Sequence, residues 1–455
     1  MLFHTYSFVL LFLPASLALY WASASRPVLR GPILFAIGVA FYSLGGLPDL
    51  ILLGALAMLT FLAARDLIGT PLPARRKVGL ALVGANLAVL LGLKVLRANH
   101  VTAAGAALPL GISFYTLNLV SYGLDVSARR TSPTRSFLSL ASYATFFPTV
   151  ASGPLIRFDA FDSQRAARPK IDPVLIEMGL LAFVGGLAKK LLVADPLGAA
   201  IDPLFANFEG AGLRESWLAV LGYAFQLYFD FSGYTDMAIG VAAFLGFRVP
   251  PNFDAPYTAV HIADFWQRWH MTMSRWFRDY MFLPLSRSLL RRAPSLDGAE
   301  RIRAFCLVLT MIAIGLWHGA TWAFLAWGLY HGLLLAAHAR VRTIRRLSVP
   351  VWAARGLTFV TVLVGWVLLR SPSPGMALRL WEGMLGLHGW GGPVTGLQRT
   401  LALVVPLLLV VTNLRLDLRV LQPRRTVWQS WAFALLLAAS LLAMGKPSPF
   451  LYFQY

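Results

Sequence analysis

Apolar stretches of membrane-spanning length follow one another along most of this chain. They lie near 7–22, 31–47, 48–64, 78–96, 137–158, 174–194, 216–247, 303–317, 320–338, 351–369, 399–413 and 428–444. A helix needs about 20 apolar residues to cross a hydrocarbon core about 30 Å thick, so each stretch is a candidate span. Several stretches are too short or too polar to cross alone. The pattern therefore predicts an all-α integral membrane protein with about ten or eleven transmembrane helices.

Polar residues interrupt this pattern in three places. The segments are "LPLGISFYTLNLVSYGLDV" (108–126), "TFFPTVASGPLIRF" (145–158) and "YAFQLYFDFSGYTDMAIGVAAFLGF" (223–247). Polar or non-helical backbone is tolerated at membrane depth only when protein covers it or when it lines a wet cavity. We therefore expect re-entrant or interfacial helices around an internal funnel or tunnel. No soluble domain stands apart, so residues 1–455 are predicted to form a single polytopic membrane domain.

Composition and charge agree with this class. The 455 residues are 58% hydrophobic and 13% charged, whereas a soluble domain is about 25% charged. The formal net charge of +20 sits largely in short basic runs between apolar stretches, such as "PARRK" (73–77) and "RVRTIRR" (340–346). This is the positive-inside distribution of a membrane protein, and it argues against nucleic-acid binding.

The first apolar stretch could be mistaken for a signal peptide. Its leading residues, "MLFHT", carry no Lys or Arg, whereas Arg26 and Arg30 follow the stretch. A signal peptide has the opposite arrangement. We therefore expect the first span to be retained, with its N-terminus outside.

The most unusual segment is "DFWQRWHMTMSRWFRDYMFLPL" (264–285). Read as a helix, it places Trp266 and His270 on one face. Its opposite charges stand four residues apart and can pair, Asp264 with Arg268 and Arg275 with Asp279. We predict one amphipathic helix near the cytoplasmic face, with the His270 side turned inward. An interfacial helix with a tryptophan belt is the alternative, but it leaves His270 unexplained.

A second concentration is "GLWHGATWAFLAWGLYHGLLL" (315–335). His318 ends an apolar run beside Trp317, and an ionisable residue at membrane depth is a functional candidate by default. The alternative is a neutral histidine bonded to a backbone carbonyl. Burial disfavours the imidazolium, so we expect a buried, neutral ring. Gly315 and Gly319 are expected to leave room for a substrate to approach it.

Two further histidines follow in the same region. His331 lies thirteen residues after His318, nearly opposite on a continuous helix, so the two share a site only if the helix breaks. We interpret His331 and His338 as packing or interfacial residues. Cys306 is the single cysteine, which excludes an internal disulfide and a cysteine-based metal cluster. No metal site is expected.

At these residues the sequence resembles the membrane-bound O-acyltransferase family, in the bacterial branch that acetylates alginate and transfers D-alanine to teichoic acid. The resemblance covers nearly the whole chain and rests on the two histidine segments together with "PPNFDAPY" and the terminal "FLYFQY". One departure follows "MFLPL", where the branch usually has a glycine turn and this chain has "SRSLLRRAPSLDGAERIR". The core that carries the motifs spans about 108–340 of the sequence.

The resemblance implies a catalytic role for His318, with His270 as the second histidine of the site. It implies an acyl thioester donor on the cytoplasmic side, acetyl-CoA by preference, with no bound cofactor. The acceptor would be an exported polysaccharide, or a periplasmic SGNH-type acetyltransferase that relays the group, and the setting is the bacterial inner membrane with its lipids. Candidate residues that contact the substrate or line the tunnel are Trp266, Arg268, Arg275, Asp279, Trp317, Tyr228 and Asp236.

Other functions stay open from the sequence. Peptidoglycan O-acetylation and D-alanyl transfer would use the same family site. A transporter or flippase for a lipid-linked sugar would be expected to show repeated halves, whereas the polar motifs here crowd between about 220 and 335. A non-catalytic scaffold would explain the basic loops but not His318. A hydrolase-type serine mechanism is disfavoured because "DFSGYTD" lacks the Gly-x-Ser-x-Gly elbow.

Overall fold

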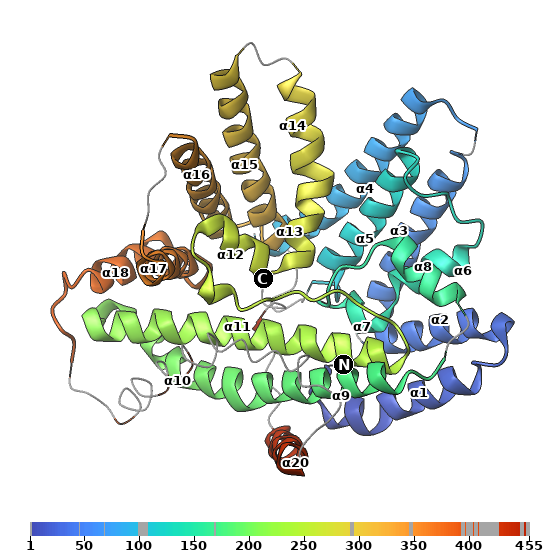
Figure 1. The fold of residues 1–455 in the computed structure, drawn as a ribbon, viewed down its shortest axis with the longest axis horizontal. Helices are drawn as coiled ribbons and strands as arrows, with labels where there is room; N and C mark the ends of the chain where they lie inside the picture. Colours follow the sequence, from blue (N-terminus) through green and yellow to red (C-terminus); the bar gives the residue numbers. More distant parts are fainter. Residues whose placement is uncertain are drawn as a thin grey trace. The chain divides into compact units, whose positions relative to one another are not determined.

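A computed structural model describes residues 2–44, 46–67, 69–98, 108–167, 170–291, 295–344, 349–392 and 427–445, and also 396, 404, 408, 450 and 451. Within these residues the chain is helical, without a strand (Figure 1). The all-α prediction is therefore confirmed for the described part. The predicted stretch 399–413, apart from residues 404 and 408, and the last four residues of the tail lie outside it.

The chain divides into two compact units, each considered by itself. Unit 1 contains Met1–Ala188, Gly233–Pro251 and Leu421–Gln454, and unit 2 contains Lys189–Ser232, Asn252–Val420 and Tyr455. One long helix, α11 (Leu213–Phe244), contributes its first part to unit 2 and its last part to unit 1.

Unit 1 contains most of the N-terminal helices. Its elements are η1 (Ser7–Phe12), α1 (Leu13–Ala22), α2 (Pro27–Ser43), α3 (Leu47–Arg65), α4 (Leu72–Ala98), α5 (Ile112–Ser127), α6 (Phe137–Ala144), α7 (Phe147–Val150), α8 (Phe158–Ala166), α9 (Pro173–Ala188), the end of α11, and α20 (Val427–Ala443). The bounds of α3 and α20 lie within one residue of the predicted apolar stretches, whereas α2 begins and ends four residues earlier than its stretch. Apolar periodicity therefore located these helices well.

Glycines let two helices of unit 1 meet backbone to backbone. A Cβ added at Gly186 of α9 would lie 2.5 Å from the carbonyl oxygen of Gly233 on α11. One added at Gly240 would lie 2.6 Å from the carbonyl oxygen of Gly179. Figure 1 shows α9 and α11 running side by side. Small residues at crossings are the usual device for packing helices in a membrane.

The predicted polar interruption at 145–158 does break the helical pattern. After the short α7, residues 151–157 are not helical, and residues 151–156 are buried. The Tyr143 hydroxyl donates a hydrogen bond to the Ile156 carbonyl at 2.7 Å. Non-helical backbone is thus covered by protein, as expected at this depth. The other two interruptions are different, because they fold into α5 and α11.

A basic residue of the "PARRK" run has a structural role in unit 1. Arg75, near the start of α4, is 6% exposed. Its guanidinium donates to the carbonyls of Leu67 at 2.8 Å and Val126 at 2.5 Å, near the ends of α3 and α5. A buried charge is costly unless it is hydrogen-bonded, and helix C-terminal carbonyls are good acceptors for a cation.

Unit 2 holds both histidine segments. Its elements are η2 (Lys189–Ala194), α10 (Asp195–Ala206), η3 (Phe208–Gly210), the first part of α11, η4 (Pro256–Thr258), α12 (Ile262–Arg268), α13 (Met271–Phe277), η5 (Arg278–Phe282), α14 (Leu283–Leu290), α15 (Leu296–His318), α16 (Trp322–Ile344), α17 (Val351–Arg370) and α18 (Pro374–Met384).

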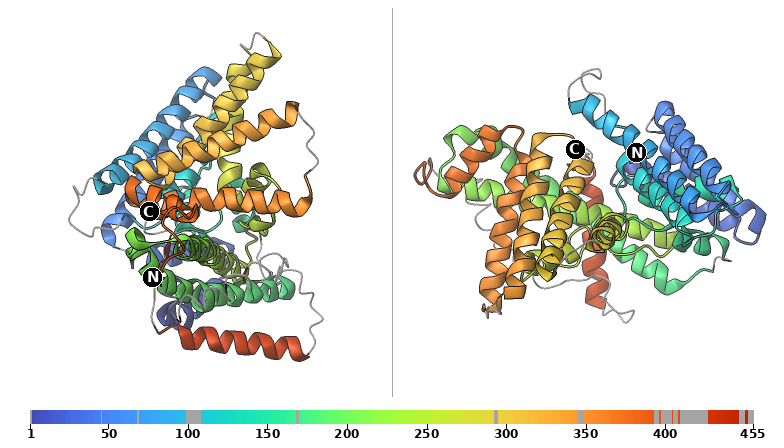
Figure 2. Two further views of the ribbon diagram at one scale, coloured as in Figure 1. Left: turned by 90° about the vertical axis from the view of Figure 1, so that its left-hand side faces the viewer. Right: turned by 90° about the horizontal axis from the view of Figure 1, so that it is seen from above.

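The central feature of unit 2 is the pair α15 and α16, which fold back on each other as a tight hairpin. Figure 2 shows this pair, in gold and orange, from two further sides. A Cβ at Gly328 of α16 would lie 2.5 Å from the Met311 carbonyl oxygen, and one at Gly332 would lie 2.7 Å from the Val308 Cα. The glycines of α16 therefore set the close spacing of the hairpin.

A buried ion cluster joins three elements of unit 2. Lys190 of η2 is 2% exposed, and its Nζ lies 2.7 Å from carboxylate oxygens of both Asp195 and Asp230. These aspartates belong to α10 and α11. Buried charges persist only when they are paired, so the lysine holds these elements in register.

Three described helices are long and apolar enough to cross a membrane. They are α3, α4 and α17, and shorter apolar helices cover Ser7–Ala22, Pro27–Ser43 and Ser430–Ala443. The membrane character predicted from the sequence agrees with these helices. The number of crossings, ten or eleven, stays a prediction.

Candidate active site

The tryptophan-rich segment predicted as one helix is broken at its histidine. α12 ends at Arg268 and α13 begins at Met271. Between them His270 has a backbone φ of 44°, in the left-handed region that residues other than glycine seldom adopt. The Asp254 N–H donates to the Arg268 carbonyl at 3.0 Å, and the Met271 N–H donates to the Asn252 carbonyl at 2.9 Å. The single-helix prediction is wrong because this neighbouring loop replaces the helical hydrogen bonds.

One of the two predicted charge pairs is confirmed. The Arg268 Nε donates to Asp264 at 2.7 Å, and its Nη1 lies 3.3 Å from Asp254. Asp279 instead accepts from its neighbour Arg278 at 2.9 Å. These two residues lie in the π-helical turn η5, which changes the register after α13. Arg268 is therefore already engaged by two carboxylates.

The hydrogen bonds of His270 define its tautomer. Its Nδ1 lies 3.1 Å from the Asn252 Oδ1, which also accepts the Thr272 N–H at 3.1 Å. A backbone N–H can only donate, so the Asn252 atom is the oxygen and the His270 Nδ1 carries a proton. His270 is 1% exposed and lies outside the three candidate spans. Burial lowers the pKa of His270 to about 3, so its ring is neutral at neutral pH, with its lone pair on Nε2.

His318 is the last residue of α15. Its ring centre lies 4.8 Å from that of Trp317, 5.6 Å from that of Trp327 and 6.1 Å from that of Phe324. The ring is partly exposed, whereas we expected it to be buried. The helix ends beside it, at Gly319, and this end leaves part of the ring uncovered.

The fold brings the two predicted histidines together. The ring centres of His270 and His318 are 6.5 Å apart. Trp317 lies against both, at 6.1 Å from His270 and 4.8 Å from His318. Ring centres at this distance leave room for one polar atom of a substrate to lie between the two imidazoles.

The glycines beside His318 do not leave the expected space. A Cβ at Gly315 would meet the carbonyl oxygen of Phe324, and one at Gly319 would meet the Phe324 ring. The prediction of an open approach at these glycines is therefore wrong. Their role is to let α16 pack directly on the end of α15.

The helix breaks between α15 and α16, so His331 does not lie opposite His318 as it would on one continuous helix. Its ring centre lies 4.9 Å from that of Trp327 and 5.3 Å from that of Trp266, and the residue is fully buried. His338 stacks on His261, with ring centres 4.4 Å apart. Both histidines pack against other rings, in agreement with the interpretation from the sequence.

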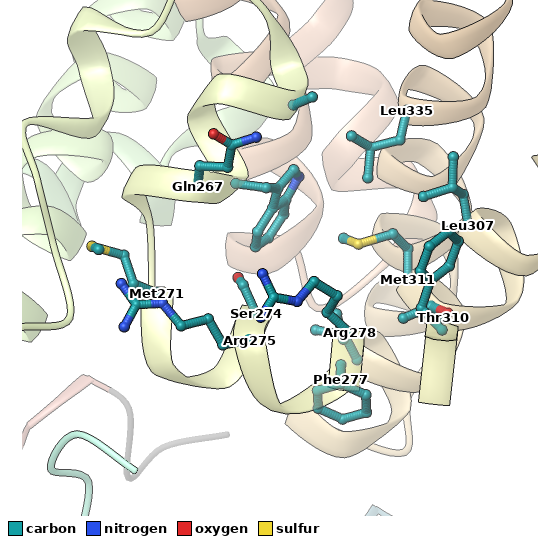
Figure 3. Close-up of a pocket in the computed structure, with 14 residues that line it drawn as sticks. Gln267, Met271, Ser274, Arg275, Phe277, Arg278, Leu307, Thr310, Met311 and Leu335 are labelled. Atoms are coloured by element: carbon teal, nitrogen blue, oxygen red, sulfur yellow. The ribbon is translucent and has the colours of Figure 1, made fainter. Parts of the chain in front are cut away.

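A pocket of about 630 Å³ opens beside the broken helix (Figure 3). Arg275 and Arg278 border it from α13 and η5, and Trp266 borders it from α12. Leu307 and Met311 of α15 form part of the opposite, apolar side. A pocket of 300–1,000 Å³ with an apolar wall and a few polar groups suits a small organic ligand.

Arg278 was missed as a site residue by the sequence reasoning. Its side chain is 58% exposed. It nevertheless borders the pocket together with Arg275. The useful signal was its spacing, since residues three apart share a helix face.

The remaining candidates lie in different surroundings. Tyr228 belongs to an aromatic cluster in unit 2, with its ring centre 5.6 Å from that of Tyr257 and 6.3 Å from that of Trp269. Trp317 contacts the histidines directly. Asp236 lies on the last part of α11, is partly exposed and belongs to unit 1.

The described residues offer no metal centre. No group of three or more His, Cys, Asp or Glu side chains able to hold a metal ion occurs among them. Cys306 is buried within α15.

These features define the class: a protein whose described part is helical, with membrane-length apolar helices and two histidine rings brought together in one site. Comparison with known proteins places it further. The sequence model of the membrane-bound O-acyltransferase (MBOAT) family matches residues 82–369 of this chain. The chain is 31% identical to the probable alginate O-acetylase of Pseudomonas putida over the whole of both chains. It is also 31% identical to the peptidoglycan O-acetyltransferase of Helicobacter pylori, over 86% of this chain and 80% of that one.

A more partial likeness connects the chain to the teichoic acid D-alanyltransferase of Bacillus subtilis, with 32% identity over 50% of this chain and 58% of the relative. The family match and the full-length relatives agree with one another. The chain belongs to the membrane-bound O-acyltransferase family and is an O-acyltransferase.

Proposed function

We propose that this enzyme takes an acetyl group from acetyl-CoA on the cytoplasmic side and moves it across the bacterial inner membrane for O-acetylation of an exported polysaccharide. The observation that carries the proposal is the contact of His270 with His318, whose ring centres are 6.5 Å apart. Two relatives that cover most of the chain are named as acetylases of alginate and peptidoglycan. The protein would cross the membrane many times and contact its lipids.

His318 is the general base in this proposal. It takes the proton from the acceptor hydroxyl while that oxygen attacks the thioester carbonyl carbon. The tetrahedral intermediate then collapses, the carbon–sulfur bond breaks, and the leaving thiolate takes the proton from His318. The ester and the free thiol are the products. Trp266 and nearby backbone N–H groups are candidates to stabilise the oxyanion.

The pocket beside the broken helix is proposed to bind the donor. Guanidinium groups pair well with phosphate oxygens, and Arg275 and Arg278 both border the pocket. Arg268 is engaged by Asp264 and Asp254, so the phosphate role falls to the other two arginines. The apolar side, with Leu307 and Met311, suits the acyl arm of the donor. Contact with lipid headgroups is the alternative role for these arginines.

The acceptor is proposed to be a polysaccharide, reached directly or through a periplasmic SGNH-type acetyltransferase. D-alanyl transfer from a carrier protein would use the same two histidines, and it is the function named for the B. subtilis relative. Donor choice separates these possibilities, because only the first accepts acetyl-CoA.

The test is the effect of His318→Ala on thiol release from acetyl-CoA and on acetyl transfer to polysaccharide in membranes. Both rates should fall by roughly 10²–10⁴-fold, the contribution of general-base catalysis, at equal amounts of inserted protein. His270→Ala should reduce them less, and His338→Ala, away from the site, should leave them unchanged. Wild-type transfer by His318→Ala would refute the catalytic assignment.

A further inference from the structure

Asn252 connects the "PPNFDAPY" loop to the site, and the mechanism has not yet used it. The residue is 1% exposed. Its Oδ1 accepts from the Thr272 N–H at 3.1 Å and from the Thr272 hydroxyl at 2.9 Å, and its backbone carbonyl accepts from Met271. Through these bonds Asn252 satisfies the first N–H groups of α13, which have no partner within that helix.

The same oxygen holds the His270 ring. Because the His270 Nδ1 lies 3.1 Å from an atom that can only accept, its proton is fixed on Nδ1. The other nitrogen, Nε2, is then an acceptor in the neutral ring. His270 is additionally held by its left-handed backbone and by Phe231, whose ring meets it edge-on with centres 4.7 Å apart.

We propose that Asn252 is a positioning residue that keeps His270 in its Nδ1–H tautomer, so that His270 Nε2 accepts a hydrogen bond from the His318 side of the site. This inference rests on the proposed function. His318 takes the acceptor proton at one nitrogen and keeps an N–H at the other. In this proposal one oxygen atom bridges that N–H and His270 Nε2, and ring centres 6.5 Å apart leave room for it.

The proton balance of this arrangement is simple. His270 keeps its proton on Nδ1, hydrogen-bonded to Asn252 Oδ1, and takes up no second proton. His318 alone accepts the reacting proton and returns it. Among the described rings in contact with His270, His318 is titratable, whereas Phe231 and Trp317 are uncharged. Fixing the tautomer of one imidazole so that it orients another is the role that an acceptor behind a histidine commonly has.

Three variants of the full-length membrane protein test this assignment, with acetyl-CoA as donor and thiol release as the readout. Asn252→Leu removes the acceptor, so we expect kcat to fall by about 10²-fold with KM for acetyl-CoA unchanged. Thr272→Val removes one of the three hydrogen bonds at Asn252 Oδ1 and leaves the His270 bond, so its kcat should stay within about two-fold of wild type.

The third variant, Asn252→Asp, guards against loss of folding in the first. Aspartate preserves every acceptor contact but places a negative charge 3.1 Å from the His270 Nδ1. A carboxylate stabilises the imidazolium, so His270 protonates at higher pH and loses its acceptor. Wild type already loses rate at acidic pH when His318 protonates, and we expect this acidic limb of kcat to move to higher pH in Asn252→Asp.

The outcomes separate this inference from the proposed function. If His318→Ala abolishes thiol release while Asn252→Asp has the pH profile of wild type, Asn252 is only a helix cap and the inference is wrong. Wild-type kcat in Asn252→Leu would overturn it equally. If His318→Ala keeps full activity, the proposed function itself fails, whatever the Asn252 variants do.

Discussion

Replacing Arg275 with alanine should weaken binding of the donor's phosphates without affecting the chemical step. Arg275 borders the pocket and is exposed, so water screens its charge. A hydrogen bond to a charged group contributes about 1.5–3 kcal/mol, and screening favours the low end of that range. At 1.4 kcal/mol per ten-fold, the KM for acetyl-CoA should rise about ten-fold. Arg278→Ala should have a similar or smaller effect.

The donor can be changed along with the protein, which makes the assay specific. Acetyl-pantetheine carries the same thioester and amide arm but no phosphate. Arg275→Ala should raise KM for acetyl-CoA and leave KM for acetyl-pantetheine unchanged, and 0.5 M salt should reduce the difference between the two donors in wild type. Arg301→Ala, a change on α15 at a residue paired with Asp297, is the matched control.

Two results would refute this reasoning. An equal rise in KM for both donors would mean that Arg275 shapes the pocket rather than binding phosphate. A ten-fold effect of Arg268→Ala, with none from Arg275→Ala or Arg278→Ala, would return the phosphate site to the residue that pairs with Asp264 and Asp254.

Two stability predictions follow from the packing of unit 2. Lys190→Met leaves the buried carboxylate of Asp230 and the partly buried carboxylate of Asp195 without this cation, so the protein should lose about 3–5 kcal/mol of stability and insert poorly, as measured by the yield of monodisperse protein. Full yield from Lys190→Met would show that the cluster is solvated. Gly328→Ala should force α15 and α16 apart at a cost of about 1–3 kcal/mol of stability. Its Tm should be lower than that of the control Gly356→Ala, whose added Cβ meets nothing within 4 Å, and equal Tm values would contradict the close packing.

Much of the helical framework could be predicted from apolar periodicity. The stretches at 351–369 and 428–444 agree within one residue with α17 and α20. Length and hydropathy suffice to locate these two helices, because their bounds depend little on specific side chains. The break at His270 could not be found in this way, since α12 and α13 have helical periodicity on both sides of it. Only the distant Asn252 loop, through tertiary hydrogen bonds, interrupts the ladder.

In the candidate site, too, some residues could be predicted from the sequence and others could not. His270 and His318 stand out from sequence because an imidazole among apolar and aromatic residues is conspicuous. The glycines beside His318 led to a wrong prediction, because a glycine can make room either for a substrate or for a neighbouring helix. Here Phe324 of α16 fills the space. Arg278 was overlooked although it follows Arg275 by three residues, a spacing that places both side chains on one helix face, and both border the pocket.

The positions of the two histidines on their helices also decide which one should carry the reacting proton. His318 is the C-terminal residue of α15, a helix of 23 residues, where the unpaired carbonyls favour a positive charge by about 0.3–1 kcal/mol. His270 precedes α13, at a helix N-terminus, where a positive charge is disfavoured, and it is buried against Phe231 and Trp317. An imidazolium is therefore better tolerated at His318 than at His270. This asymmetry favours the proposed roles, with His318 as the base and His270, held by Asn252, as the neutral acceptor beside it.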